Sequence, residues 1–265
     1  MKYYVVDVFT DKIFGGNPAG VCLLEDWLPD GTMQNIAMEN CLSETAFLVK
    51  RDGYYGLRWF TPEIEVDLCG HATMGSAFVL FNFVETDASS IIFSTQSGML
   101  TVEREGGLLR MNLPSRPPVP APKYGSVAKA FRIEKFEMLK SADLLVVLDS
   151  EEDVLGARPD LALLKEVKGE AGIPDDNFGV IITAPGSDCD FVSRFFAPNC
   201  GVDEDPVTGR AHCVLTPYWS KRLGKTSMSA RQLSKRGGRL WCEDEGARVT
   251  IGGKAVLYSI GEISL

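Results

Sequence analysis

The sequence has little positive charge and no long hydrophobic run. Its 27 Lys and Arg residues are outnumbered by 36 Asp and Glu residues, which leaves a net charge of −9 at pH 7. Binding to a phosphate backbone draws on clustered Lys and Arg, so this balance argues against a nucleic-acid partner. The longest apolar runs, around Ala77–Phe81 and Leu144–Leu148, are far shorter than the roughly 20 residues that a membrane-spanning helix needs. We therefore expect no membrane partner.

Cysteine pairing motifs are also absent. The cysteines are odd in number and contain no C-x-x-C pair; they are Cys22, Cys41, Cys69, Cys189, Cys200, Cys213 and Cys242. This pattern argues against a disulfide framework and against a zinc knuckle, so we expect reduced thiols and no metal site. The first residues contain no signal-peptide apolar core. A cytoplasmic location is the expectation that follows.

Only two histidines occur, and each lies in a segment of the same kind. His71 follows Asp67–Gly70, and His212 follows Gly201–Gly209. Each segment has acidic residues, then a glycine turn, then the small-residue start of an apolar helical run. A helix that begins in this way leaves backbone N–H groups free to face an anion. Both segments are therefore candidate anion-binding sites.

The order of motifs in the first half of the chain recurs in the second half. Three pairs of segments match in type and order: Pro29-Asp30 with Pro159-Asp160, Arg58–Pro62 with Arg194–Pro198, and Cys69–Thr73 with Thr208–His212. Each Pro-Asp pair is predicted to open a helix, which runs to about Asn40 in the first half and to about Val167 in the second. Several markers in one order favour a duplication over coincidence.

Local patterns predict strands around one buried helix in each half. The helix that begins at Cys69-Gly70-His71 is apolar on nearly every side, which is typical of a helix wrapped by a sheet. In the first half, strands are predicted at Lys2–Phe9, Val21–Leu24 (after a turn cluster at Phe14–Gly20), Ala46–Val49, Leu57–Pro62, Ile91–Phe93, Met99–Arg104 and Gly107–Asn112. We predict an α+β fold of two pseudo-symmetric domains, each a curved sheet or barrel around a central apolar helix.

The boundary between the domains is predicted at a proline-rich stretch. Pro114–Pro122 contains five prolines and is the best linker in the chain. The predicted domains are residues 1–115 and 116–265, and the last strand, around Val256–Ile263, is expected to cross back to the first domain. Because ligands favour clefts between domains, such a cleft is the expected binding site.

The ordered motifs resemble the phenazine-biosynthesis PhzF-like isomerase family, which has the diaminopimelate-epimerase-type fold. The resemblance extends over nearly the whole chain. It rests on Val6–Phe9, Gly16–Ala19, Ser43–Ala46, Cys69–Thr73, Arg194–Pro198, Glu204–Gly209 and Gln232–Gly238.

The resemblance implies a cofactor-free isomerase of a small acidic substrate. In the family, the glutamate matching Glu44 moves a proton between carbons, and the residues matching His71 and Asp205 line the same pocket. Family members are often homodimers, so a homodimer is expected. Substrate contacts are expected from residues of the same motifs, namely Asn17, Cys69, Gly70, Ala72, Thr73, Thr208, Gly209 and Arg210.

The residues themselves leave the roles of these three side chains open. Glu44 lies at the entrance of a predicted strand, where desolvation could raise its pKa toward the range of a general acid or base, although most glutamates are solvated surface groups. His71 could instead satisfy a hydrogen bond in the core. Asp205 could complement a helix dipole, a role that is compatible with substrate contact.

Two other functions are weighed against the isomerase. An amino-acid racemase or epimerase of the same fold needs a base on each face of the carbon, as in enzymes with two cysteines. Cys69 has the position for this, but Cys213 lies four residues after Gly209 and the equivalent position is Thr208, so buried inert cysteines are favoured. The second alternative is a binding or interaction protein without turnover.

Arg210 departs from the family pattern, which has Ser at this position. A cation in the first turn of a helix opposes the dipole, so a compensating contact is expected. The favoured interpretation is an ion pair with one of three nearby acidic residues, Asp203, Glu204 or Asp205. The alternative is that Arg210 binds a carboxylate or phosphate of the substrate with its planar fork.

Overall fold

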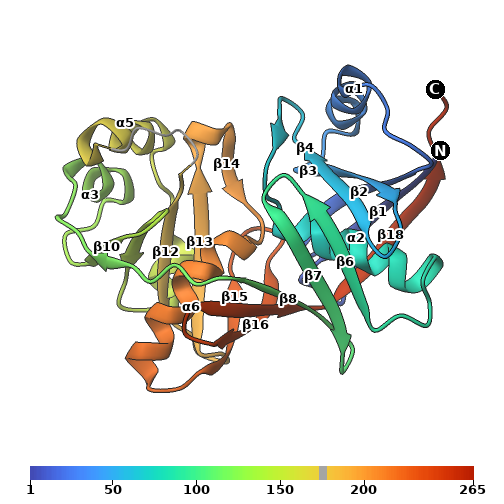
Figure 1. Ribbon diagram of the computed structural model, residues 1–265. Helices are drawn as coiled ribbons and strands as arrows, with labels where there is room; N and C mark the ends of the chain where they lie inside the picture. Colours follow the sequence, from blue (N-terminus) through green and yellow to red (C-terminus); the bar gives the residue numbers. More distant parts are fainter. Residues whose placement is uncertain (173–177) are drawn as a thin grey trace. The chain divides into compact units, whose positions relative to one another are not determined.

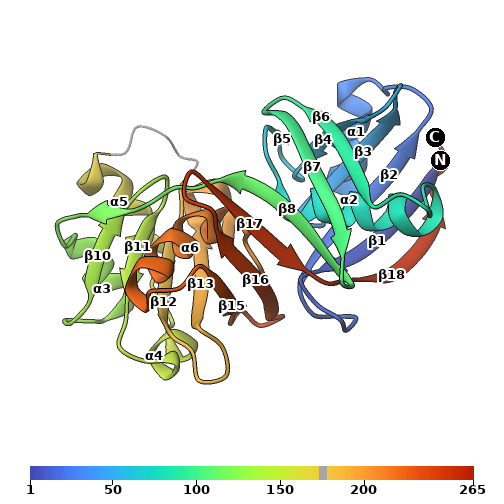
Figure 2. The same ribbon diagram turned by 60° about the horizontal axis from the view of Figure 1, so that its bottom comes forward.

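The computed structural model describes residues 1–172 and 178–265. The chain forms two compact units. Unit 1 comprises Met1–Leu113, Gly238–Leu240 and Thr250–Leu265, and unit 2 comprises Pro114–Gly237 and Trp241–Val249. Figures 1 and 2 show the elements of each unit. Within the described ranges, no helix is long and apolar enough to cross a membrane.

Unit 1 is a mixed sheet built around one helix. Its elements are β1 (Lys2–Val8), β2 (Asn17–Leu24), α1 (Asp30–Asn40), β3 (Glu44–Lys50), β4 (Tyr55–Phe60), β5 (Glu65–Val66), α2 (Gly70–Phe83), β6 (Ser90–Thr95), β7 (Gly98–Glu105), β8 (Leu108–Pro114) and β18 (Ala255–Glu262). The strands pair in the order β18-β1-β2-β3-β4-β6-β7-β8. The last strand of the chain, β18, is thus antiparallel to the first.

Helix α2 lies inside the curve of this sheet. It contacts β1, β2 and β3 as well as β7 and β18, so strands surround it on several sides (Figure 2). Its residues from His71 to Ala77 are all buried, as the apolar sequence predicts. Gly75 allows the close approach to the sheet, because a Cβ there would lie 3.3 Å from Ala19 Cβ and 3.4 Å from a Val8 methyl. The shorter α1 covers the outer face, where Met33 and Ile36 pack with Phe47 of β3.

Unit 2 has a sheet covered by helices on both faces. Its elements are β9 (Val119–Pro120), α3 (Gly125–Phe131), β10 (Glu137–Lys140), β11 (Leu144–Val147), α4 (Glu151–Gly156), α5 (Leu161–Ala171), β12 (Val180–Pro185), β13 (Phe191–Ala197), the 3₁₀ turn η1 (Pro198–Cys200), β14 (Val202–Asp205), α6 (Gly209–Leu223) and β15 (Ser227–Gln232). Two more strands, β16 (Gly238–Asp244) and β17 (Arg248–Gly253), are divided between the units.

The central strands of unit 2 are buried on both faces. Val180 and Ile182 of β12 pack in one cluster with Leu164 of α5. Thr183, the next residue along β12, points to the opposite face of the sheet and accepts a hydrogen bond of 3.0 Å from Trp219 Nε1 of α6. Strands covered on both sides have no regular alternation of apolar and polar residues, which explains why β12 is apolar apart from Thr183.

The repeated Arg-x-Phe motifs make the same local contacts in the two units. In unit 1, Arg58 binds both carboxylate oxygens of Glu65 at 2.6 Å, and its guanidinium lies 5.2 Å from the Phe60 ring centroid. In unit 2, Arg194 binds both oxygens of Glu204 at 2.7 and 2.9 Å and lies 4.9 Å from the centroid of the Phe196 ring. Each Arg–Glu ion pair holds a short strand, β5 or β14, against the strand that carries the arginine. This short strand precedes the central helix of its unit.

Some local predictions need correction. The segment predicted as a turn before Val21 is already strand from Asn17, because Asn17–Gly20 pair with β1. The proline-rich stretch contains β9, whose Val119 and Pro120 pair with β10. The helix after Asp160 continues to Ala171, four residues beyond the predicted end, with the Asp160 side chain as its N-terminal cap.

Candidate functional site

The first candidate cluster lies in unit 1, where the start of β3 meets the start of α2. Glu44 is the first residue of β3, and His71 is the second residue of α2. Glu44 Oε2 lies 3.2 Å from His71 Nε2, with side-chain exposures of 20% and 6%. The two atoms are close enough for an ion pair, but they do not have the geometry of a hydrogen bond. The sequence motifs thus bring a carboxylate and an imidazole together.

His71 is uncharged at neutral pH. Burial lowers its pKa to about 3, and a hydrogen bond to the Pro18 carbonyl only partly opposes this effect. Its Nδ1 atom lies 3.3 Å from the Asn17 amide nitrogen and 3.5 Å from Cys69 Sγ. The imidazole therefore stands beside Glu44 as a neutral polar group, and it adds no positive charge that would hold a proton away from the carboxylate.

The N-terminus of α2 has no side-chain cap. The residue before the helix, Cys69, makes no capping hydrogen bond, and the first turn contains no acidic residue. The Thr73 hydroxyl donates to the carbonyl of Cys69 at 2.5 Å. Ala72 and Thr73 have 0% exposure, whereas Gly70 is partly exposed, so contact of this turn with a substrate would begin at the backbone of Gly70. This turn has the features of an anion-binding helix start.

The same cluster contains three potential metal ligands. One atom each of Glu44, Cys69 and His71 lies within 4.8 Å of the others. Cys69, however, contacts Nδ1 of the imidazole, whereas Glu44 contacts Nε2. Since one imidazole binds a metal through one nitrogen, a ring placed between the other two ligands does not direct all three at a common ion. The geometry fits a proton-transfer site better than a metal centre.

The second cluster lies in unit 2, where β14 leads into α6. Asp205 is the last residue of β14, and its Oδ2 accepts a hydrogen bond of 2.5 Å from the Thr208 hydroxyl. Thr208 precedes α6 but does not cap it, and the first turn, which begins at Gly209, contains no acidic residue. The other histidine, His212, contacts the Thr208 carbonyl through Nδ1 at 2.8 Å and is fully buried. Asp205, Thr208 and Gly209 are therefore neighbours at one helix start.

Arg210 pairs with an acidic residue that the sequence did not suggest. Arg210 Nε and Nη2 each lie 3.0 Å from an oxygen of Asp143, which precedes β11 and has a fully buried side chain. The interpretation as an ion pair holds, and this acid lies 67 residues away in the sequence, outside the adjacent acidic run. Burial raises the pKa of the Asp143 carboxyl, and Arg210 opposes that shift. The sequence contained no local signal for this contact, because β11 brings Asp143 to the helix only in the folded chain.

Cys213 has the properties of a structural thiol. It is buried, and burial raises its pKa to about 12. A catalytic thiol needs a substantial thiolate population near neutral pH. Cys213 therefore does not fit the second base of a two-cysteine racemase.

The two buried histidines predict a loss of stability in mild acid. Burial lowers the pKa of His212 to about 4, as it lowers that of His71 to about 3, from the ordinary 6.5. The unfolded chain then binds more protons than the folded chain below about pH 6.5, so the free energy of unfolding falls as the pH falls through this range. Each histidine should contribute about 1.4 kcal/mol per pH unit.

Urea unfolding at about pH 7 and about pH 5.5 measures this dependence. In the variant His212→Gln, the pH dependence of the free energy of unfolding should be smaller by the contribution of one histidine. Asp244→Asn, which alters an acidic residue, serves as a control that keeps both histidines. An unchanged pH dependence in His212→Gln would contradict the prediction.

Comparisons with known proteins agree with this fold. The family model of phenazine biosynthesis-like proteins matches residues 6–261. An uncharacterized isomerase of Pseudomonas aeruginosa is 51% identical over 266 residues, which cover 100% of this chain and 99% of that protein. The crystal structure of a PhzF-family phenazine biosynthesis protein from Enterococcus faecalis matches with a TM-score of 0.94 and 47% identity, covering 100% of this chain and 99% of that one.

A more distant structure shows how far the fold extends. A probable proline racemase from Agrobacterium radiobacter K84 matches with a TM-score of 0.63 at 10% identity, covering 100% of this chain and 93% of that chain. The protein is thus an enzyme of the isomerase class, with a mixed α/β fold that racemases share. Within that class, the chain belongs to the phenazine biosynthesis-like family, as its motifs indicated.

Proposed function

We propose that the protein is a cofactor-independent isomerase that moves a proton between carbons of a small acidic substrate, with Glu44 as the general acid and base. The observation that carries the proposal is the position of the Glu44 carboxylate, 3.2 Å from a buried neutral imidazole beside an uncapped helix start. A carboxylate in such surroundings is suited to accept a proton and to return it.

The proposed reaction needs no group other than this carboxylate to carry the proton. Glu44 removes a proton from one carbon, and the electron pair of the broken C–H bond moves into the adjacent unsaturated system of the substrate. The carboxylic acid thus formed returns the proton to another carbon of that system. The enzyme ends in its starting state, so the product is an isomer.

Neighbouring groups are proposed to hold the substrate. His71 would offer a neutral imidazole nitrogen beside the carboxylate, with its ring placed against Asn17 and Cys69. The uncapped first turn of α2 would bind the acidic group of the substrate through backbone N–H groups. Asp205 stays a proposed catalytic residue, and Thr208 and Gly209 stay proposed contacts.

A racemase or epimerase remains the second candidate, because its chemistry also begins with removal of a proton from carbon. The proline racemase shares the fold. Because the two chains are only 10% identical, this similarity supports a common fold and does not extend to function. Cys69 lies within the unit 1 cluster, whereas burial keeps Cys213 protonated. This chain therefore lacks the pair of reactive thiols that the two-cysteine mechanism uses. A binding protein without turnover would have no need for the Glu44–His71 arrangement.

The two enzymatic candidates leave different isotopic products. Candidate small unsaturated acids and amino acids would be incubated with the protein in deuterated water and followed by NMR. An isomerase should yield a product with a shifted double bond and deuterium at the carbon that receives the proton. Deuterium at an unshifted stereocentre would favour the racemase, and the absence of both labelling and a changed product in every acid tested would favour a binding protein.

We further propose that the protein is a cytoplasmic homodimer. Family resemblance supports the dimer, and the seven free cysteines support a reducing compartment. Light scattering on the purified protein should give twice the 29.0 kDa chain mass. A mass equal to one chain would contradict the dimer.

A further inference from the structure

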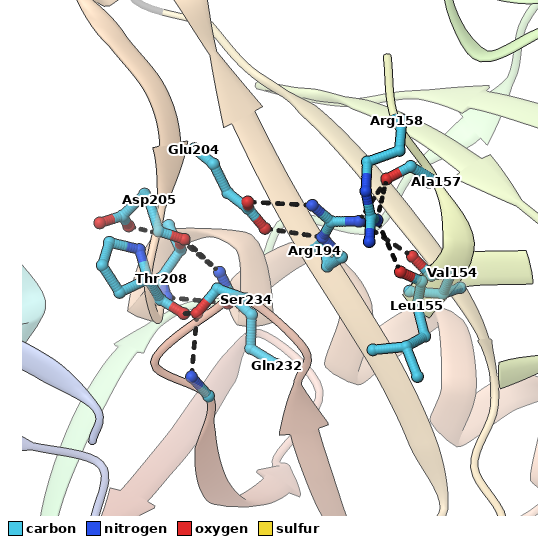
Figure 3. Close-up of polar contacts among 12 residues, drawn as sticks. Val154, Leu155, Ala157, Arg158, Arg194, Glu204, Asp205, Thr208, Gln232 and Ser234 are labelled. Atoms are coloured by element: carbon cyan, nitrogen blue, oxygen red, sulfur yellow. Dashed lines mark hydrogen bonds and ion pairs between the residues drawn. The ribbon is translucent and has the colours of Figure 1, made fainter. Parts of the chain in front are cut away.

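The loop between Asp205 and Thr208 is held by side chains from the end of β15. Gln232 Oε1 accepts from the Thr208 backbone N–H at 2.9 Å, and Gln232 Nε2 donates to the Asp205 carbonyl at 2.8 Å. The Ser234 hydroxyl donates to the Pro206 carbonyl at 2.8 Å. Figure 3 shows both residues beneath the loop, with Gln232 reaching to its two ends. Gln232 is 1% exposed, so solvent does not compete for these bonds.

The amide of Gln232 can be placed in only one orientation. The Thr208 N–H must donate, so it requires the amide oxygen, and the Asp205 carbonyl must accept, so it requires the amide nitrogen. Reversing the amide would break both hydrogen bonds inside the protein, at a cost that buried polar groups rarely bear. The backbone of the loop therefore fixes which end of Gln232 faces the Thr208 hydroxyl.

This orientation also fixes the direction of the Thr208 hydroxyl. Gln232 Nε2 lies 3.2 Å from Thr208 Oγ1, and an amide nitrogen can only donate. Thr208 Oγ1 accepts this bond, so its own proton is directed to the carboxylate oxygen of Asp205, 2.5 Å away. A hydroxyl at a helix start usually accepts from the first turn, but Thr208 makes no such bond. The Thr208 hydroxyl therefore donates to Asp205 and does not cap the helix.

We propose that Gln232 is a positioning residue that acts through Thr208, and that it fixes Asp205 as an ionised hydrogen-bond acceptor. The inference rests on the proposed function only in giving Asp205 a role toward the substrate. A hydrogen bond donated by the Thr208 hydroxyl favours the charged form of the Asp205 carboxylate, so Asp205 presents an acceptor rather than an acid proton. The substrate group that meets Asp205 is therefore a hydrogen-bond donor, such as an amine or a hydroxyl.

Both flanks of the loop are also restrained. Before the loop, Glu204 is bound through both oxygens by Arg194, which also donates to the carbonyls of Val154 and Ala157 (Figure 3). After the loop, His212 contacts the Thr208 carbonyl. Glu204, the charged residue next to Asp205 in the sequence, thus has Arg194 as a partner of its own. Thr208 is bonded at its nitrogen, hydroxyl and carbonyl.

NMR of the full-length protein without substrate tests this relay. The Thr208 hydroxyl proton, bound to a carboxylate at short distance, should give a downfield signal, and the Asp205 carboxyl carbon should have the shift of an ionised acid at neutral pH. Thr208→Val and Asp205→Asn assign the two signals. In Gln232→Glu, an acceptor replaces the amide nitrogen and competes for the hydroxyl proton, so the downfield signal should be lost.

Matched variants separate the relay from general support of the loop. Ser234→Ala removes a loop hydrogen bond but leaves the Gln232–Thr208–Asp205 contacts, so both signals should persist. Thr208→Ser restores the hydroxyl and should recover the signal that Thr208→Val loses. The proposal is overturned if Gln232→Glu keeps the downfield signal, if Ser234→Ala loses it, or if Asp205 is protonated at neutral pH. Because no turnover is measured, these results do not depend on whether Glu44 is the catalytic base.

Discussion

Replacing Glu44 by Gln is expected to reduce deuterium incorporation by about 10²- to 10⁴-fold, the usual contribution of a general acid–base group. The amide keeps the size of the side chain but cannot take a proton from carbon. Its neighbour His71 is neutral, so the change does not leave a buried cation without its counter-charge. We therefore expect the melting temperature to change little.

The measurement compares initial rates of label uptake in deuterated water, together with thermal unfolding of the same samples. Glu103→Gln is the matched control, because Glu103 is exposed on β7 of the same unit and should affect neither quantity. Normal labelling by Glu44→Gln would remove Glu44 from its proposed role. A large fall in melting temperature would instead assign Glu44 a structural role.

Much of the fold could be predicted because its strongest patterns are local. An apolar sequence on nearly every side of α2 indicated a helix enclosed by strands, and the structure places β1, β2, β3, β7 and β18 around it. The matching Arg58 and Arg194 motifs were readable because each binds a glutamate only 7 or 10 residues further on. Such contacts lie within one hairpin, where sequence spacing and spatial distance agree.

Less of the candidate site could be predicted, because it depends on pairings between distant segments. Glu44 was found through its motif, but its approach to His71 depends on the parallel pairing of β2 and β3, in which Ala19 lies opposite Glu44. Gln232 is 24 residues from Thr208, and only the pairing of β15 with β13 brings it beneath the loop. Long-range partners of this kind have no periodic signal in a single sequence.

Arg210 illustrates both the value and the limit of reasoning from the sequence. A cation in the first helical turn implied a compensating acid, and the structure contains one. The sequence suggested an exposed pair, which would contribute little to stability. The structure instead pairs Arg210 with Asp143, whose side chain is fully buried and also accepts from the Gly179 N–H at 2.8 Å. This burial changes the expected consequence of mutation.

Arg210→Ser should therefore reduce the free energy of unfolding by about 3 kcal/mol, because removing one partner leaves a buried charge uncompensated. Arg222→Ser is the control on the same helix, since its pair with Glu137 is about half exposed and should contribute less than about 1 kcal/mol. Urea unfolding of both variants measures the difference. Similar small losses in the two variants would show that the Asp143 pair does not stabilise the fold.

The dependence on pH gives this prediction a second test. Burial raises the pKa of Asp143, and loss of Arg210 should raise it further. A group whose folded pKa is raised stabilises the fold when it is protonated. The reduction in the free energy of unfolding caused by Arg210→Ser should therefore be smaller at about pH 5.5 than at about pH 7.5.

At temperatures where the Arg210→Ser variant is folded, its activity on di-acidic and mono-acidic substrates should fall equally, since the guanidinium of the natural residue is bound to Asp143. A selective loss on di-acids would show that Arg210 leaves Asp143 to bind the substrate.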